Sequence, residues 1–379
     1  MILSQEILEV KEKARRLAEE EFTKEVLDGI ESSGTFPRRI LERMRDDGLM
    51  GLKVPKEYGG TDLGNLAYVV ALEELAGKCA IAGVYLQNPN SNGSGPLLLY
   101  GTKEQKDKYL PMVVNLDIRI CFALTEPEAG SDVSGMLTEA EKVDGGYLLN
   151  GRKCFISGAQ LADYAVLFAK TDRYAGSKGI SAFLVDLHSP GVSRGAPEHK
   201  MGLAGYPIGD IILEDVFVPA ENLIGEENKG FVNAMKTLDN GRLAVAGIAL
   251  GVAQGCLDEA VRFAKETQYN GRPLAKQQSV SFTLADLNTK VTAMREMVYS
   301  AAQKKDLGYP DAGMYASMAK YFNSETCNQV AAAALQIHGE YGYMKGSEIE
   351  RKYRDCRVFT IFEGSSQIQQ MIIAGQMLR

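Results

Sequence analysis

The chain has 379 residues, of which 45% are hydrophobic and 24% are charged, a composition typical of soluble globular proteins with two or three domains. The formal net charge is −7 and the isoelectric point is near 5.3, which argues against nucleic acid or an anionic membrane as the main partner. The most apolar stretch, residues 244–256, is shorter than a membrane span, so no membrane partner is expected.

Cysteine and histidine usage points to a protein without disulfides or a metal site. The six cysteines are scattered and form no CxxC motif, which is typical of reduced thiols. None of the three histidines has a metal-like neighbour four residues on, so no metal site is expected. The N-terminal segment mixes acidic with basic residues and lacks the apolar region of a signal peptide, so we expect a cytoplasmic protein.

The predicted elements divide the chain into three domains. Residues 1–117 read as helical, with Ile7, Val10, Ala14 and Leu17 at helical spacing and a Pro/Gly-rich connector at 53–64. Residues 118–225 hold short β-rich runs divided by Gly, Asp and Asn turns. Residues 226–379 are helical again, with long helices expected at 281–305 and 312–338 and a shorter one after Glu363. We therefore predict an α+β fold with an N-terminal helical domain, a middle β-barrel-like domain and a C-terminal four-helix bundle.

Two segments of the middle domain could bind a ligand. In FALTEPEAGSD, residues 122–132, a strand runs into a turn of small and polar residues, and the N–H groups and hydroxyls of such a turn can bind a planar heterocycle or a phosphate. In KCFISGA, residues 153–159, Phe155 could stack on a ring and Ser157 could hydrogen-bond to it. An ordinary strand-to-loop turn and an ordinary half-buried strand explain the same residues.

A third candidate is Glu363, which follows the apolar residues 358–362 and precedes Gly364 near the expected start of the last helix. A carboxylate at this point could simply complement a helix N-terminus. Alternatively, apolar surroundings would raise its pKa by desolvation and suit it to accept a proton. No GxGxxG after a strand, GxxxxGK[ST] or GxSxG motif is present, so Rossmann, P-loop and serine-hydrolase functions lose support.

Taken together, ALTEPEAGSD, KCFISGA and FEGSSQIQ, in this order and at this spacing, resemble the acyl-CoA dehydrogenase family. The resemblance covers nearly the whole chain and includes LDNGR at 238–242. Within the family, the chain looks most similar to short-chain and aryl-acyl enzymes of anaerobes, including enoyl-CoA reductases such as the caffeoyl-CoA reductases.

The resemblance implies FAD, bound between the β domain and the C-terminal bundle. The residues that it places at the flavin are Phe122, Leu124, Thr125, Ser131, Phe155, Ser157, Gln336, Gly339, Ser365 and Gln367. It also implies CoA contacts from Ser131, Asp239 and Arg242, and a close approach of the thioester at Gly364. The partners that it implies are an acyl-CoA substrate and an electron-transferring flavoprotein, with the chain as a homotetramer.

The family mechanism assigns Glu363 as the base that removes the α-proton while a hydride leaves the β-carbon for flavin N5. The developing enolate is stabilised by hydrogen bonds to the thioester oxygen, in the family from the base's own N–H and a flavin ribityl hydroxyl. Some members carry the base at the position equivalent to Gly241. Glycine cannot serve as a base, which leaves Glu363 as the only motif-matched candidate.

The chain departs from the family at the segments expected to reach the adenosine half of FAD in a neighbouring subunit. Where Arg-x-x-Phe-Gly is usual, TQYNG has Thr267 and Asn270, and where Gln-x-x-Gly-Gly is usual, QIHGE has Glu340 in the second glycine's place. A lost cation should weaken phosphate binding, although Arg272 could substitute. Three functions therefore remain open. The chain could be a dehydrogenase, a physiological 2-enoyl-CoA reductase, or a flavin-poor, non-catalytic subunit that binds CoA ligands or a partner.

Overall fold

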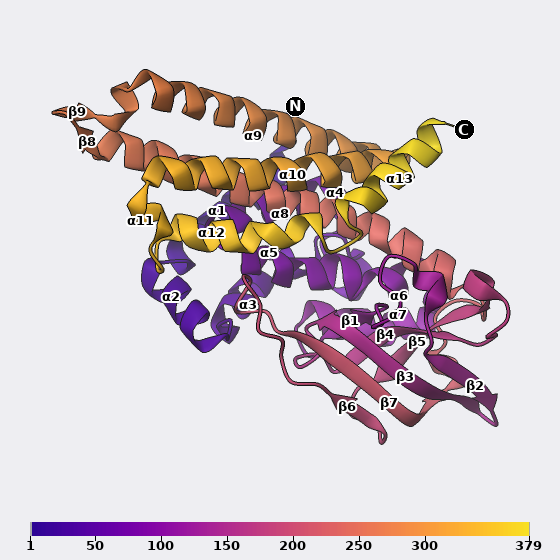
Figure 1. The fold of residues 1–379 in the computed structure, drawn as a ribbon. Coiled ribbons are helices and arrows are strands. Elements are labelled where there is room, and N and C mark those ends of the chain that lie inside the picture. The colour runs from indigo at the N-terminus through magenta and orange to yellow at the C-terminus, as the bar shows by residue number, and fades with distance from the viewer. Residues whose placement is uncertain (1, 379) are drawn as a thin grey trace.

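The computed structural model describes residues 2–378, which fold as a helical segment, a β segment and a second helical segment (Figure 1). The predicted fold class is confirmed. The helices of the first segment are α1 (Gln5–Glu21), α2 (Lys24–Ser33), α3 (Arg38–Asp46), α4 (Gly64–Lys78), α5 (Ala80–Gln87), α6 (Gly95–Tyr100) and α7 (Lys103–Val114).

Side-chain caps set the starts of several of these helices. Ser4 and Thr23 accept hydrogen bonds from the first-turn N–H groups of α1 and α2, and Thr102 with Gln105 forms a capping box on α7. The predicted apolar face of α1 is buried at Val10, Ala14 and Leu17, as helical spacing requires. Sequence periodicity is therefore a sound guide to the local structure here.

The β segment is a seven-stranded mixed sheet that curls on itself. Its strands are β1 (Ile120–Ala123), β2 (Glu139–Val143), β3 (Gly146–Ser157), β4 (Tyr164–Lys170), β5 (Ile180–Asp186), β6 (Val192–Arg194) and β7 (Ile208–Pro219). The order is β1-β4-β2-β3-β7-β6, with β5 paired to β4. The pairs β1–β4 and β2–β4 are parallel and the others are antiparallel.

The second helical segment holds the longest helices and a small hairpin. Its elements are α8 (Gly230–Glu266), β8 (Gln268–Tyr269), β9 (Arg272–Pro273), α9 (Gln278–Asp306), α10 (Ala312–His338), α11 (Glu340–Tyr343), α12 (Glu348–Cys356) and α13 (Ser366–Met377). Figure 1 shows α8, α9 and α10 side by side, with β8 and β9 at one end and α13 at the other. By length and composition α8 could cross a membrane, but 78% of its most apolar window is buried within the protein, as in the core helix of a soluble fold.

Helix α4 of the first segment packs against the second helical segment. The Asp306 carboxylate at the end of α9 accepts hydrogen bonds from the backbone N–H groups of Asn65 and Leu66 at 2.7 and 2.9 Å. These N–H groups belong to the first turn of α4 and have no partner within the helix. An anion from the C-terminal bundle therefore caps a helix of the N-terminal segment and fixes α4 beside α8 and α9.

A buried carboxylate joins the β segment to α12. Asp355 is 4% exposed and accepts a hydrogen bond from the Leu203 backbone N–H at 2.6 Å. Burial raises the pKa of Asp355 from 3.8 to about 6, against the lowering effect of that hydrogen bond. Because the folded protein holds the proton more tightly, this group stabilises the fold below pH 3.8, and the contribution is lost as the pH rises through about 6.

We predict that Asp355→Asn reduces the fall in stability of the native protein between acid and neutral pH. Asparagine keeps the acceptor for Leu203 but cannot ionise, and the pKa difference between 3.8 and about 6 corresponds to about 3 kcal/mol over the whole titration. Roughly half of this difference in unfolding free energy should appear between pH 5 and pH 7.5 in urea titrations. The exposed Asp172→Asn serves as the control, and parallel pH profiles for native protein and Asp355→Asn would contradict the assignment.

Candidate functional site

A buried ion pair clamps the two candidate segments of the β domain together. Lys153 is fully buried, and its Nζ donates to the Glu126 carboxylate at 2.6 Å and to the Leu124 carbonyl at 3.2 Å. One residue along, the Cys154 N–H donates to the Thr125 carbonyl at 2.9 Å. The structure therefore brings residues 122–132 against residues 153–159.

The charges of this clamp are matched. Burial lowers the pKa of Lys153 to about 8, while the Glu126 charge opposes that shift. Burial alone would raise the pKa of Glu126, but the Lys153 charge and the Leu137 N–H lower it overall. An ion pair out of water requires such close contacts, because each charge loses its hydration.

A β-bulge turns Phe155 out of the sheet. The register of β3 against β7 shifts between Lys153 and Ile156, and Phe155 has a φ of +54° and is 62% exposed. Bulges commonly redirect a side chain beside a functional site, and a positive φ is unusual for an aromatic residue. The exposed ring is therefore placed where a planar ligand could stack on it.

The other predicted flavin residues of the β domain differ in exposure. Leu124 is buried, Phe122 and Thr125 are half-buried, and Ser131 and Ser157 are exposed. Phe122 also packs on Phe168, with ring centroids 5.0 Å apart. The Lys153–Glu126 ion pair anchors the two segments, and Ser131, Ser157 and Phe155 are exposed on them. Exposed hydroxyls and an exposed aromatic ring fit the polar edge and the face of an isoalloxazine ring.

Glu363 lies in the interior between helices from both helical segments. Its Oε1 accepts hydrogen bonds from Asn92 Nδ2 at 2.6 Å and Gln87 Nε2 at 3.1 Å. Its Oε2 is out of contact with solvent and has no hydrogen-bond partner among residues 2–378. A Cβ on Gly241 of α8 would lie 2.4 Å from Oε2. Glycine at position 241 therefore provides the space that the Glu363 carboxylate occupies.

Sequence reasoning missed Gln87 and Asn92, which reach Glu363 because the chain forms a π-helical turn over Asn88–Asn92. Residues five apart lie on one face of such a turn, so both amides point to the same carboxylate. Asn88 of this turn also donates to the Ile120 carbonyl of β1 at 2.8 Å. The π-helical turn thus connects Glu363 with the strand that carries Phe122.

The backbone around Glu363 is held in a left-handed turn. Glu363 and Gly364 have φ values of +54° and +81°, a conformation that is costly for a residue other than glycine. Lys320 Nζ on α10 donates to the Gly364 carbonyl at 2.6 Å, and Gln369 Nε2 on α13 donates to the same carbonyl at 2.8 Å. The Glu363 N–H has no acceptor among the described residues, so it is available to a ligand oxygen.

The electrostatic surroundings of Glu363 favour proton exchange. Burial raises the pKa of its carboxyl group, and the Asn92 hydrogen bond and the charges of Lys320 and Arg242 oppose this shift in part. A carboxylate whose pKa is raised by desolvation is a suitable general base near neutral pH. The structure thus favours the desolvated carboxylate over the helix-capping interpretation, and α13 begins only at Ser366.

Two of the residues predicted to contact CoA lie on α8, and the charge of one of them, Arg242, acts on Glu363. Arg242 on α8 is 5% exposed and forms an ion pair with Asp239, which is more exposed. Arg242 Nε has no hydrogen-bond partner among the residues described. Of the residues predicted to contact the flavin after Glu363, Ser365 is half-buried and Gln367 is exposed. Ser131 is the one predicted CoA residue contributed by the β domain.

Gln336 and Gly339 lie far from this site within one chain. Gln336 is sixteen residues beyond Lys320 on the same helix, a distance of about 24 Å at 1.5 Å per residue. Phe263 at the end of α8 packs on His338 and Tyr341, with ring centroids 4.4 and 6.0 Å apart. The QIHGE and TQYNG segments therefore share the far end of the molecule, near β8 and β9 (Figure 1).

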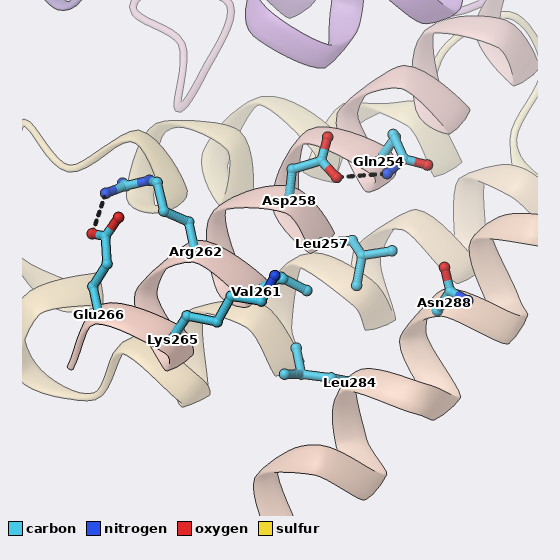
Figure 2. Close-up of a pocket in the computed structure, with 9 residues that line it drawn as sticks. All are labelled: Gln254, Leu257, Asp258, Val261, Arg262, Lys265, Glu266, Leu284 and Asn288. Carbon is cyan, nitrogen blue, oxygen red and sulfur yellow. Dashed lines mark hydrogen bonds and ion pairs between the residues drawn. The ribbon is translucent and has the colours of Figure 1, made fainter. Parts of the chain in front are cut away.

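A cavity between α8 and α9 is separate from Glu363 and has a volume of about 410 Å³. Figure 2 shows Leu257, Val261 and Leu284 at its apolar side, and Arg262 paired with Glu266 at its rim. Gln254, the lining residue nearest Gly241 in sequence, is thirteen residues from it, about 20 Å along the helix. The cavity therefore has no part in the chemistry of Glu363.

Comparison with known proteins covers all three segments. The family models for the N-terminal, middle and C-terminal domains of acyl-CoA dehydrogenases match residues 4–117, 121–216 and 228–378. The caffeyl-CoA reductase–Etf complex subunit CarC of Acetobacterium woodii is 52% identical, over 100% of both chains. The 3-(aryl)acrylate reductase of Clostridium sporogenes is 48% identical over 98% of both. The structure of butyryl-CoA dehydrogenase from Megasphaera elsdenii superposes with a TM-score of 0.97 at 36% identity, covering 100% of each chain.

We predict that Lys153→Met destabilises the protein by about 3–5 kcal/mol, because Glu126 then remains as a buried charge without its partner. The double variant Lys153→Met/Glu126→Gln should recover more than half of this loss, since glutamine still accepts from the backbone. Arg152→Met provides a matched control one residue away, where an exposed ion pair with Asp210 should contribute at most about 1 kcal/mol. Urea denaturation measures all three, and a loss for Lys153→Met no larger than the control's would show that the clamp is dispensable.

Proposed function

The chain belongs to the acyl-CoA dehydrogenase family, and we propose that it exchanges two electrons between an acyl-CoA and the matching 2-enoyl-CoA, using FAD, with Glu363 as the proton-transfer group. The observation that carries this proposal is the geometry of the Glu363 carboxylate. One oxygen is anchored by Gln87 and Asn92, and the other is desolvated and unpartnered. A base held in this way is ready to take a proton without losing its position.

In the oxidative direction, Glu363 Oε2 accepts the α-proton of the thioester. The free N–H of Glu363 is available to the thioester oxygen, where negative charge develops. Lys320 and Gln369 hold the turn that carries both groups. Burial of Oε2 keeps water from competing for the proton.

Bound FAD would supply the acceptor for the β-hydride. The residues at the edge of the β domain fit its ring system, since Phe155 is exposed at a bulge and Thr125 is fixed through the Lys153 clamp. At the far end of the molecule, Arg272 is exposed and forms no ion pair with any described residue. It is the cation that we propose for the FAD pyrophosphate in place of the arginine that Thr267 replaces.

A second candidate is the physiological reductase, which uses the same residues in reverse. It is favoured by the similarity to two proteins named as reductases, at 52% and 48% identity. The raised pKa of Glu363 also suits a carboxyl group that delivers a proton to the α-carbon. Because the name of the Acetobacterium woodii relative includes an Etf complex, we propose an electron-transferring flavoprotein as the electron partner.

A non-catalytic subunit has less support, because the residues around Glu363 are intact and matched to proton transfer. We further propose a homotetramer. Gln336 lies about 24 Å from Lys320 along α10, and Gly339 follows the end of that helix, so we assign both residues to a flavin bound in another copy. Several large apolar side chains are exposed near them, namely Tyr269, Tyr341, Tyr343 and Met344.

We predict that Glu363→Gln binds FAD and acyl-CoA but slows flavin reduction at least about 100-fold. Glutamine keeps the shape and an acceptor for Asn92 but cannot take a proton. The measurement is the bleaching of the oxidised flavin band near 450 nm, a general property of flavins, after anaerobic addition of butyryl-CoA and of 3-phenylpropionyl-CoA.

The exposed Glu139→Gln, which breaks only a surface ion pair with Arg173, should bleach at the native rate. Full bleaching by Glu363→Gln would remove Glu363 from the mechanism. A native protein that stays colourless after incubation with FAD would instead support the non-catalytic subunit.

We predict that Thr267→Arg tightens FAD binding by about tenfold, since it restores a charge-assisted hydrogen bond to phosphate. The dissociation constant is measured by flavin fluorescence quenching on the apoprotein. Thr289→Arg, on the exposed face of α9, adds the same charge elsewhere and should have no such effect. Unchanged affinity in Thr267→Arg, with weaker binding in Arg272→Gln, would show that Arg272 already holds the pyrophosphate.

A further inference from the structure

Two buried donors without hydrogen-bond partners, Tyr68 and Lys53, lie side by side in the protein interior. Tyr68 on α4 has 0% exposure, and its hydroxyl makes no hydrogen bond with any described residue. The Lys53 ammonium is also out of contact with solvent and without a partner, and it lies 5.5 Å from the centroid of the Tyr68 ring. Buried donors are nearly always paired, because leaving one unpaired is costly. Two adjacent exceptions therefore indicate that something else completes them.

Printed contacts connect these donors to the base. The Lys53 N–H donates to Asn90 Oδ1 at 3.2 Å, and Asn90 belongs to the π-helical turn that supplies Asn92 to Glu363. Burial, and then the negative charge of Glu363, raise the pKa of Tyr68 well above its ordinary value. Lys53 is therefore joined to the π-helical turn that anchors Glu363, and Tyr68 lies within the influence of the Glu363 charge.

Lys53 and Tyr68 offer hydrogen-bond donors, and the unpartnered acceptor nearby, Glu363 Oε2, is the atom proposed to exchange a proton with the substrate. Burial and the nearby charge of Lys305 lower the pKa of Lys53 to about 7, yet both the ammonium and the amine carry N–H donors. Tyr68 stays protonated and donates its hydroxyl hydrogen. The charge of Asp306 raises the pKa of Lys53 in part. The Asp306 carboxylate, however, already accepts hydrogen bonds from the first turn of α4.

The acyl tail is the part of the substrate that suits these donors best. Glu363 must lie at the α-carbon, and the large anionic CoA moiety must extend to solvent. Tyr68 Oη and Lys53 Nζ have no contact with solvent, so we assign them to the tail. An alkyl tail would leave both donors unpaired, whereas an oxygen at its far end would satisfy them.

We propose that Lys53 and Tyr68 form the distal end of the acyl-binding site and select acyl groups that carry an oxygen acceptor far from the thioester. This rests on the proposed function, because it extends the site of that reaction. Such an acyl group needs an oxygen that accepts hydrogen bonds from Lys53 Nζ and Tyr68 Oη. Two kinds of group carry such an oxygen, a phenolic hydroxyl and a terminal carboxylate.

The experiment compares matched pairs of 2-enoyl-CoA substrates on the FAD-loaded enzyme, with reduced methyl viologen as the electron donor. One pair is 3-(4-hydroxyphenyl)acryloyl-CoA and 3-phenylacryloyl-CoA, and the other is glutaconyl-CoA and 2-pentenoyl-CoA. In at least one pair the oxygenated member should have a KM lower by about tenfold or more. Lys53→Met should bring that ratio to within about twofold by raising the KM of the oxygenated member, with a smaller change in kcat. Calorimetric dissociation constants in the Glu363→Gln background should follow the same pattern without turnover.

Lys103→Met is the matched control, because Lys103 also lies over a tyrosine ring, 5.8 Å from the centroid of Tyr58, but at the exposed surface. It should keep the native ratio. Tyr68→Phe removes a single oxygen and should also reduce the difference in KM within the pair. It tests the proposal if Lys53→Met does not fold. Equal KM values within both pairs, or native ratios in Lys53→Met and Tyr68→Phe, would overturn the inference and leave the proposed function standing. A native enzyme that reduces none of the four substrates would overturn both.

Discussion

The close approach of α4 and α8 is the constraint on which the rest of the site depends. A row of glycines on α8, at 247, 251 and 255, faces α4, and a Cβ at Gly251 or Gly255 would lie 2.4 or 2.1 Å from a carbonyl oxygen of α4. The two backbones can meet at this distance only without side chains between them. Each added Cβ would force the helices apart, and the residues that they position would separate with them.

That approach places groups from distant parts of the chain around one carboxylate. Helix α8 presents Gly241 to Glu363, while α5 and the π-helical turn, which follow α4, supply Gln87 and Asn92. Burial then raises the pKa of Glu363, and two amides and two cations moderate the effect. The balance matters, because a fully compensated carboxylate would be a weak base and an uncompensated one would stay protonated. The surroundings of Glu363 therefore stabilise its negative charge only in part.

Much of the fold follows from local sequence signals, whereas the site does so only in part. Periodicity predicted α10 over residues 312–338 and the change to β structure near residue 118, because both depend on neighbouring residues. The residues around Glu363 left two interpretations open, and only the resemblance to a family predicted its role as the base. Gln87 could not be predicted, because it lies 276 residues from Glu363 in sequence. Asn92 lies in a stretch rich in Asn, Ser, Gly and Pro, which resembles a loop but forms a π-helical turn.

The departures from the family and the intact base are compatible because they lie at opposite ends of one bundle. Phe263 packs on His338 and Tyr341, so TQYNG and QIHGE share one surface, about 24 Å from Lys320 along α10. Screening and distance make a charge change at that surface a small perturbation of the Glu363 carboxylate. Thr267 and Glu340 can therefore change how tightly a cofactor's distal half is held while the pKa of the base stays the same. On the proposed function, proton transfer and cofactor retention belong to separate parts of the chain, so each could vary without the other.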